Sequence, residues 1–537
     1  MKATLSKRRM IPKWRPVAKS LQSPEVAPLK PKPVDVPRPN AEEFEIAQMQ
    51  FEKNPTAGHF GDLLAFSVFP ECVPAVRDIA KAAISKGVSL SSAQRAIAGI
   101  VAADADIEVE PPLCLEDKKN PFSELLQDHR RLLKANPENP LLLLDFAQLQ
   151  LAGGNTKSAE KSLRLAQGML PDHPLVLRTV ARFLVHVDKK YRAHALIASH
   201  PSTKLNPWLM ASELALADVA GVKPKFYGAA KKVIDSGRFP DRHIAELAAA
   251  ISSHQLSAGH PKEARRSFTK AVLAPNDNVA AQIVTDQRDL NISLNTQGLI
   301  QVIEATHEAN ALVAASRGQH SAAIKSAQAW LCEEPFSSRP AQFLSSVYVY
   351  NEDPQRALEV AKVGLRADPN EVGLLINACY LHALLGDLEA SAAAGRRAVQ
   401  LDRNLALPFI YSTYGMLSIL AGDYEHGESL YRDAMHDFER TGRNALKGLC
   451  ATFFAQTAVR ANLPKAEDIL QEAIELVRKY PCPESVTVLS KLTKRENLPV
   501  SRMRLFEQYV YHPSTNTLVR TSGVTSPGAP LIIWANE

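Results

Sequence analysis

The sequence predicts an all-α fold in which antiparallel helix pairs stack side by side into a solenoid. The first observation is a recurrence of small residues at a spacing of 34, which separates Ala159 from Ala193 and also Ala323, Ala357 and Ser391 from one another. The second is composition, because Ala and Leu dominate the middle of the chain and aromatic residues make up only 6%. Ala favours helices since it loses no side-chain entropy there.

Small residues occupy fixed places in each predicted unit. Two antiparallel helices approach closely only where side chains are small, and a turn-former ends the second helix because Pro cannot continue it. One helix pair cannot bury its apolar face alone, so neighbouring pairs must stack. The eighth, twentieth and twenty-seventh places hold Ala147, Ala159 and Ala166 in the unit from Pro140, Ser345, Ala357 and Gly364 from Ser338, and Cys379, Ser391 and Ala398 from Val372.

This pattern resembles the tetratricopeptide repeat family over roughly residues 122–478. The resemblance implies a right-handed superhelical solenoid. Five units fit well and two later ones have longer connections; they start near Pro140, Pro174, Glu304, Ser338, Val372, Pro408 and Lys447. His200 and Trp330 stand where the family has Ala, which makes the helix crossing at these two places uncertain.

Composition divides the chain into five segments. The predicted segments are a disordered basic Pro-rich tail at 1–40, a helical segment and linker at 41–118, a first repeat block at 119–300 with an irregular stretch at 207–303, a second repeat block at 301–480, and closing helices with a short irregular tail at 481–537. One or two closing helices are expected within 485–513.

The N-terminal tail carries the basic character of the chain. Residues 1–40 hold ten Lys or Arg, two acids and eight prolines, a net charge of +8, whereas the whole chain is only +6. Proline lacks an amide donor and cannot enter a helix interior, so the stretch APLKPKPVDVPRPN at residues 27–40 is expected to be extended and solvated. It is either a flexible leader or an electrostatic tether to nucleic acid, acidic lipid or an acidic protein surface.

The six cysteines stand far apart, with no CxxC pair, so neither a zinc knuckle nor a redox dithiol is predicted. Such cysteines are usually small buried hydrophobic residues, which favours a reducing compartment. No apolar run has the length of a bilayer span or of a secretory signal core. A cytoplasmic protein without a transmembrane segment is therefore expected.

Motifs of catalysis are missing from the sequence. It contains no Gly-rich phosphate loop ending in Gly-Lys-Ser/Thr, no GxGxxG after a strand, no HExxH and no GxSxG. His194 and His200 are six residues apart and so do not share a helix face. We predict that the protein is not an enzyme and has no catalytic, cofactor-binding or metal-binding residues.

The resemblance also implies a groove lined by the first helix of each unit, which would bind an extended peptide or a partner helix. The places that face this groove hold Leu144, Gln148, Arg178, Arg182, His186, Gln342, Ser346, Tyr350, Ile376, Tyr380 and Met416. Tyr350 and Tyr380 could equally be packing residues between helices. Binding of an acidic chaperone tail is not expected, since the places of the Lys and Asn clamp hold Gln342, Ser346 and Asn377.

Two hypotheses on function follow. The first is a non-catalytic scaffold or adaptor that binds a protein segment in the groove. The second is a tethered regulator, in which the basic tail contacts nucleic acid or an anionic surface while the repeats recruit a protein.

Overall fold

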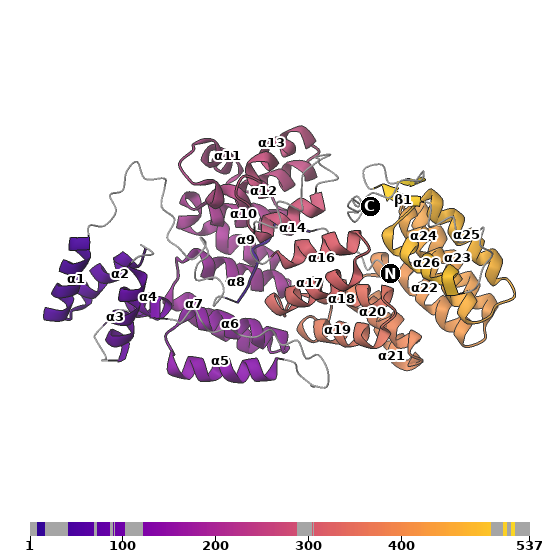
Figure 1. The fold of residues 1–537 in the computed structure, drawn as a ribbon, viewed down its shortest axis with the longest axis horizontal. Helices are drawn as coiled ribbons and strands as arrows, with labels where there is room; N and C mark the ends of the chain where they lie inside the picture. Colours follow the sequence, from indigo (N-terminus) through magenta and orange to yellow (C-terminus); the bar gives the residue numbers. More distant parts are fainter. Residues whose placement is uncertain are drawn as a thin grey trace. The chain divides into compact units, whose positions relative to one another are not determined.

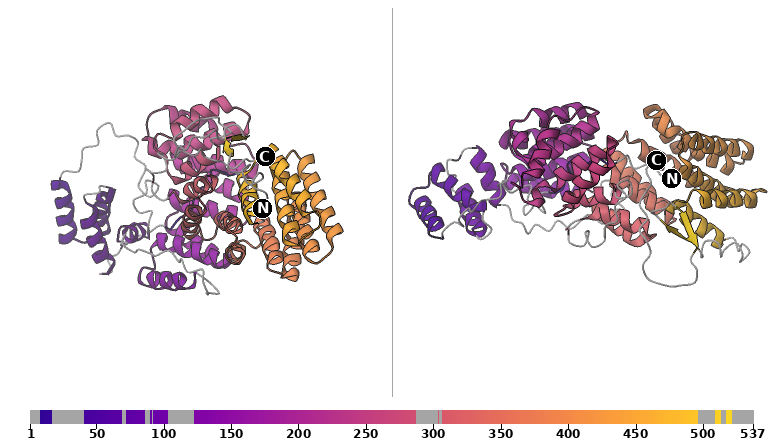
Figure 2. Two further views of the ribbon diagram at one scale, coloured as in Figure 1. Left: turned by 45° about the vertical axis from the view of Figure 1, so that its right-hand side comes forward. Right: turned by 90° about the horizontal axis from the view of Figure 1, so that it is seen from above.

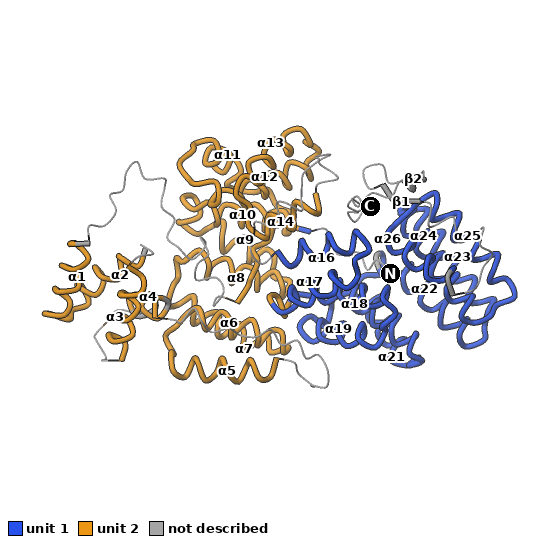
Figure 3. Tube along the Cα trace, viewed as in Figure 1, with its two compact units in different colours: residues 1–8, 306–332, 337–537 blue, residues 9–305, 333–336 orange. Residues whose placement is uncertain are grey.

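The computed structural model describes residues 8–16, 41–68, 72–85, 90, 92–102, 122–286, 303, 306–495, 509–512 and 517–520. The chain forms two compact units (Figure 3). Unit 1 comprises residues 1–8, 306–332 and 337–537, and unit 2 comprises residues 9–305 and 333–336. Within the described ranges, no helix has both the length and the apolar composition needed to cross a lipid bilayer.

Unit 2 is built of helices (Figure 1). They are α1 (Ala41–Lys53), α2 (Ala57–Ala65), the short 3-10 helix η2 (Phe66–Val68), α3 (Val73–Ser85), α4 (Ser92–Ala102), α5 (Ser123–Ala135), α6 (Pro140–Ala152), α7 (Thr156–Met169), α8 (Pro174–His186), α9 (Lys190–Ser199), the 3-10 helix η3 (Pro201–Leu205), α10 (Pro207–Ala220), α11 (Tyr227–Asp235), α12 (Asp241–Ser257), α13 (Pro261–Ala271) and α14 (Asp277–Asp286).

Helices α1 to α4 form a small bundle with its own core around Phe60, Leu63 and Ala80, each fully buried. This bundle joins the repeats through α4, where Asn139 donates from Nδ2 to the carbonyl of Gly99 at 3.1 Å. Helices α1 to α4 lie within the segment predicted at 41–118, and most of the linker expected there lies outside the described residues.

Helices continue at regular spacing from residue 207 to residue 286, within the stretch that was predicted to be irregular. The first helices of successive pairs begin at Pro140, Pro174, Pro207, Asp241 and Asp277, a spacing of 33 to 36 residues. Asn-Pro starts two of them, since the side chains of Asn139 and Asn206 accept hydrogen bonds from the first-turn amides while proline needs no partner there. Residues 207–286 therefore extend the array as α10 to α14.

Unit 1 contains the second set of helix pairs. Its elements are α16 (His307–Ser316), α17 (His320–Glu333, with Glu333 in unit 2), α18 (Ser338–Tyr350), α19 (Pro354–Ala367), α20 (Val372–Leu384), α21 (Leu388–Leu401), α22 (Arg403–Leu420), α23 (Tyr424–Arg440), α24 (Asn444–Arg460), α25 (Ala466–Lys479), α26 (Pro483–Arg495), β1 (Tyr509–His512) and β2 (Thr517–Arg520). Successive helices from α18 to α25 pack against each other (Figure 2). The structure confirms the predicted all-α fold of antiparallel, tetratricopeptide-like helix pairs.

Helix crossings contain the small residues that the sequence predicted. Ser345 and Ser391 are fully buried, and each donates its hydroxyl to a carbonyl twelve residues away on the paired helix. A Cβ on Gly427 would lie 2.7 Å from the carbonyl oxygen of Gly415, so backbones touch directly where α22 meets α23. Trp330, one of the two departures, is also buried, at 1% exposure.

The turn between the helices of a pair requires a left-handed backbone. Gly318, Glu352 and Gly386 occupy this place in three successive units and have φ of 69°, 65° and 87°. Gly154 and Asp188 occupy it in unit 2, with φ of 83° and 54°. Glycine adopts this conformation without steric cost, whereas Asp188 and Glu352 adopt it at some cost.

The C-terminal region differs in part from its prediction. One closing helix forms, α26, but residues 509–512 are a strand that pairs antiparallel with 517–520. The sequence YVYH alternates aromatic and β-branched residues, which favour strands over helices. The LIIW run lies outside the described residues.

Candidate functional site

Part of the basic tail lies against unit 2 instead of in solvent. Residues 9–16, hereafter segment 9–16, form neither helix nor strand, as expected, but Met10, Pro12 and Trp14 are buried while the residues between them are half-buried. This alternation is that of an extended chain with one side against a surface. Segment 9–16 is therefore packed on the protein, whereas residues 27–40, for which an extended and solvated chain is expected, lie outside the described ranges.

Side chains of two first helices hold the backbone of segment 9–16. Gln148 of α6 donates from Nε2 to the carbonyl of Trp14 at 2.6 Å. Asn278 of α14 donates from Nδ2 to the carbonyl of Ile11 at 3.3 Å. Extended backbone buried on a protein surface needs such partners because an unpaired carbonyl is costly there. We call the side of the first helices that faces segment 9–16 the inner face of unit 2.

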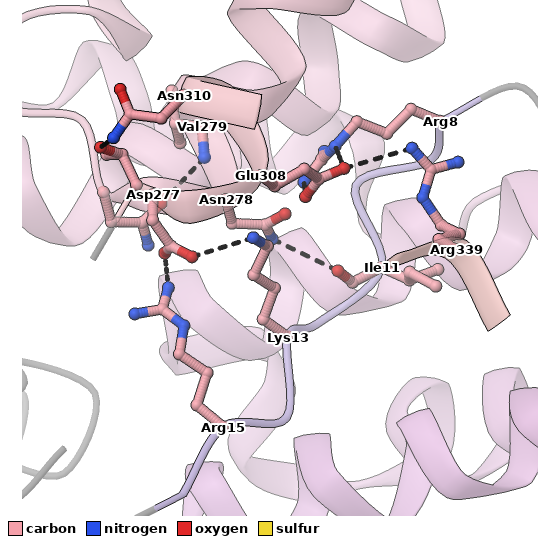
Figure 4. A network of polar contacts seen from close by, with 12 residues as sticks. Arg8, Ile11, Lys13, Arg15, Asp277, Asn278, Val279, Glu308, Asn310 and Arg339 are labelled. Carbon is pink, nitrogen blue, oxygen red and sulfur yellow. Dashed lines mark hydrogen bonds and ion pairs between the residues drawn. The ribbon is translucent and has the colours of Figure 1, made fainter. Parts of the chain in front are cut away.

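Cations of the segment meet buried acids on this face (Figure 4). Lys13 lies 3.0 Å from Asp277, and Arg15 forms an ion pair with the same carboxylate, which is only 1% exposed. Arg9 forms an ion pair with Asp218 of α10. In unit 1, Arg8 likewise binds Glu308 through two nitrogens at 3.0 and 3.2 Å, and Arg339 joins the same carboxylate.

An aromatic cluster surrounds the indole of Trp14. Its ring centroid lies 4.8 Å from that of Phe336, and both side chains are almost completely buried. The guanidinium of Arg182 lies 4.9 Å above the Phe336 ring, and His186 meets the same ring edge-on at 5.6 Å. Both residues come from α8, so this helix supplies cationic and aromatic partners to residues 333–336.

A buried polar ladder crosses the inner face of unit 2. Arg178 donates to Ser212 at 3.1 Å and to Glu246 at 2.5 Å, and these three residues stand 34 apart on α8, α10 and α12. Asn278 continues the ladder by donating to Glu246 at 3.1 Å. The Arg178 guanidinium also lies 5.2 Å from the centre of the Trp208 ring. These hydrogen bonds connect the first helices α8, α10, α12 and α14 to one another.

Unit 1 has a cavity of about 550 Å³ beside its first helices. Its lining comes from α18, α20, α22, α24 and α26, from the turn after α18 and from the first residue of α19: Val349, Tyr350, Glu352, Pro354, Tyr380, Leu384, Met416, Leu420, Phe453, Gln456, Thr457, Val459, Arg460, Val488, Lys491 and Leu492. We call this side of the first helices the inner face of unit 1. Most of the lining is apolar, with Glu352, Arg460 and Lys491 as its charged residues.

Helix α26 lies on the inner face of unit 1 and forms one wall of the cavity. Lys491 donates from Nζ to the carbonyl of Tyr350 at 2.7 Å. Burial raises the pKa of the Tyr350 phenol well above its usual value, and the carboxylate of Glu484 adds to the shift. Burial also raises the pKa of Tyr380, whose ring meets Phe453 at 5.4 Å. These phenols are neutral and act as apolar walls with a polar tip.

The eleven residues predicted for a groove are divided between the first helices of the two units. Leu144, Gln148, Arg178, Arg182 and His186 belong to unit 2; Tyr350, Tyr380 and Met416 line the cavity of unit 1. Gln342, Ser346 and Ile376 are on α18 and α20 but do not line it; Asn377 bridges to Gln342 and Ser346 at 3.5 and 3.4 Å. Whether any of the eleven binds a partner stays a prediction.

Several residues that contact segment 9–16 or form the ladder were not predicted from the sequence. Ser212, Glu246, Asp277 and Asn278 stand in the stretch that appeared irregular. Projecting the 34-residue spacing from Arg178 would have found Ser212 and Glu246. Nothing in the sequence alone indicated that Trp14 would pack on Phe336, because 322 residues separate them.

Within the described ranges, no group of three or more His, Cys, Asp or Glu residues could hold a metal ion. Burial raises the pKa of Cys379 to about 11, and the pKa of Cys450 to about 12. These two thiols therefore stay protonated, as small buried residues do.

Comparisons with known proteins identify similar structures only. No family model matches the chain. No curated protein matches it either. Similar solved structures are the APC/C hetero-tetramer Cut9-Hcn1 (10% identity, TM-score 0.47, 85% of this chain and 87% of that one), a monomeric mutant of IFIT1 with Gppp-AAAA (12%, 0.35, 67% and 96%) and a human IFIT1 dimer with m7Gppp-AAAA (13%, 0.35, 68% and 96%).

Proposed function

We propose that this protein is a non-catalytic scaffold that binds segments of partner proteins along the inner faces of its helix pairs. The observation that supports this is segment 9–16 itself. An extended chain is held on the inner face of unit 2 by amide side chains at its carbonyls and by carboxylates at its cations. Recognition of this kind uses the backbone for affinity and the side chains for specificity.

The inner face of unit 1 offers a second, open place. A cavity of about 550 Å³ with apolar walls and charged residues among its lining has the size and chemistry of a site for one or two side chains of a partner. Tyr and Arg residues, which often anchor interfaces, are among its lining residues.

No contact of the described tail residues favours the tethered-regulator hypothesis. Each tail cation that the structure describes forms an ion pair with a carboxylate of the chain; these cations are Arg8, Arg9, Lys13 and Arg15. Nucleic acid or an anionic surface would have to displace these carboxylates first.

Co-purification with two matched variants tests the scaffold proposal. Leu420 and Leu401 are each the last residue of a helix, and they are 39% and 44% exposed, but only Leu420 lines the cavity. Tagged full-length wild type, Leu420→Glu and Leu401→Glu are compared by quantitative mass spectrometry of bound proteins. We expect a set of proteins that is lost with Leu420→Glu and kept with Leu401→Glu. If every bound protein survives both changes, the cavity is not a partner site and the proposal fails for unit 1.

A further inference from the structure

The inner face of unit 2 contacts the side chains of segment 9–16 as well as its backbone. Side chains alternate along it: Met10, Pro12 and Trp14 are turned into the protein, whereas Lys13 and Arg15 share the carboxylate of Asp277. A neutral residue at either cationic place would remove one of the two ion pairs of Asp277, whose side chain is 1% exposed, and an acidic residue there would place a like charge beside it. The surface therefore selects two cations spaced two residues apart in an extended chain.

The aromatic place is specific for shape rather than for a hydrogen bond. Trp14 packs on Phe336, which is itself held between Arg182 and His186. The indole nitrogen of Trp14 is buried, and no described residue accepts a hydrogen bond from it. A buried donor without an acceptor weakens binding, by about tenfold in typical cases. A segment that lacks this unpaired donor would therefore bind the face more tightly than segment 9–16 does.

We infer that the inner face of unit 2 is a receptor for an extended protein segment with an aromatic residue flanked by two cations, in the order Lys-aromatic-Arg, and that segment 9–16 occupies this receptor as a competitor within the chain. The inference rests on the proposed scaffold function and names the partner class for one of its two faces. A competitor joined to its receptor acts at an effective concentration in the millimolar range. A partner must therefore bind more tightly than segment 9–16, for example with Phe in place of Trp14.

A labelled peptide tests this inference on the full-length chain. The probe is KRRMIPKWRPVA, the sequence of residues 7–18, and its binding is measured by fluorescence anisotropy. The receptor is wild type or the variant Lys13→Glu/Arg15→Glu, which changes the competitor and leaves every receptor residue intact. We expect the peptide to bind this variant at least about tenfold more tightly than wild type, because the weakened competitor no longer fills the site.

Matched controls separate specific competition from a change of charge. The variant Lys19→Glu/Lys30→Glu alters the net charge of the tail equally but lies outside segment 9–16, so it should bind the peptide as weakly as wild type. A peptide with Trp14→Phe should bind the receptor at least as tightly as the original, and one with Trp14→Ala about tenfold more weakly. Equal binding of the Phe and Ala peptides would overturn the aromatic part of the inference.

Two further outcomes would overturn the inference as a whole. If Lys13→Glu/Arg15→Glu folds, as judged by hydrogen exchange of α6 and α14, and binds no peptide, segment 9–16 is a fixed part of the core. If wild type is a dimer that this variant abolishes, a second copy supplies the segment and the competitor does not act within one chain. Should the double variant not fold, Arg9→Glu replaces it, since this side chain is 34% exposed; a folded Arg9→Glu protein that binds the peptide no more tightly than wild type counts against the inference. These results concern unit 2 alone, so they can fail while the Leu420 test on unit 1 succeeds.

Discussion

The inner faces of the two units are built on helix pairs of the same kind but carry different side chains. In unit 2 the face carries a buried ladder of Arg178, Ser212 and Glu246, and an extended segment lies on it. In unit 1 the corresponding face is aromatic and apolar, a helix packs on it, and a cavity remains. Because both units contain such pairs, the repeat spacing determines the fold. The residues of the first helices that do not contact the paired helix determine the chemistry of each inner face.

The difference extends to what covers each face. Segment 9–16 contributes cations and carbonyls, which match the carboxylates and amides of unit 2. Helix α26 contributes Val488 and Leu492, which match the apolar wall formed by Tyr380 and Phe453, and one Lys491 that reaches a carbonyl. In both units the cover comes from outside the repeats.

The largest expected effect comes from removing one partner of the polar ladder. Glu246→Ala leaves the buried guanidinium of Arg178 without its carboxylate and should lower the free energy of unfolding of unit 2 by about 3–5 kcal/mol. The control is Asp235→Asn, which breaks the ion pair with Lys270 at a 68% exposed carboxylate and should cost below about 1 kcal/mol. Hydrogen exchange of α8, α10 and α12 in urea measures both. Equal losses would mean that the ladder does not organise unit 2.

A second, smaller effect tests how closely paired helices approach each other. Gly427→Ala in unit 1 places a methyl group 2.5 Å from Ile419 and 2.7 Å from the backbone of Gly415, which should cost about 1–3 kcal/mol. Gly168→Ala in α7 of unit 2 meets no atom within 4 Å and should gain about 0.5–1 kcal/mol, because Ala loses less backbone entropy. Thermal unfolding distinguishes the two signs. A neutral Gly427→Ala would show that these helices can separate without loss.

How far the sequence predicts this molecule depends on the range of the interaction. Helix pairs follow from small residues twelve places apart, such as Ser345 and Ala357, because the two crossing helices are neighbours in the chain. The region of α10 to α14 was harder to predict, since the eighth, twentieth and twenty-seventh places of the unit from Pro207 hold Leu214, Phe226 and Val233 in place of small residues.

The covers of the inner faces could not be predicted from the local pattern. Lys13 meets Asp277 and Lys491 meets Tyr350, contacts that span 264 and 141 residues. The burial of segment 9–16 could not be foreseen, because the buried acid that pairs with Lys13 and Arg15, Asp277, stands in an apparently irregular stretch.

A third effect, of about 0.5–1 kcal/mol, comes from the turns within helix pairs. Asp188 has φ of 54° and is exposed, at the place where Gly154 stands in the preceding pair. Asp188→Gly should stabilise unit 2 by that amount because glycine adopts this conformation without steric cost. Gly154→Ala should destabilise it by about 1–2 kcal/mol for the opposite reason. If Asp188→Gly is destabilising, a side-chain contact of Asp188 outweighs the backbone strain.

The smallest effect is a pH dependence that involves His243 of α12 in unit 2. Burial, and secondarily the charge of Arg242, lowers the pKa of His243, whose ring lies 6.4 Å from that of Trp208. Above pH 6.5 the imidazole is neutral in both the folded and the unfolded chain, so its contribution to stability is constant. As the pH falls below 6.5, the unfolded chain takes up the proton first and the stability of unit 2 decreases until the folded pKa is passed. His243→Gln should therefore reduce, without abolishing, the loss of thermal stability between pH 7.5 and 5.5, because burial also lowers the pKa values of His129 and His320. An unchanged loss in His243→Gln would place the pH dependence at these other histidines.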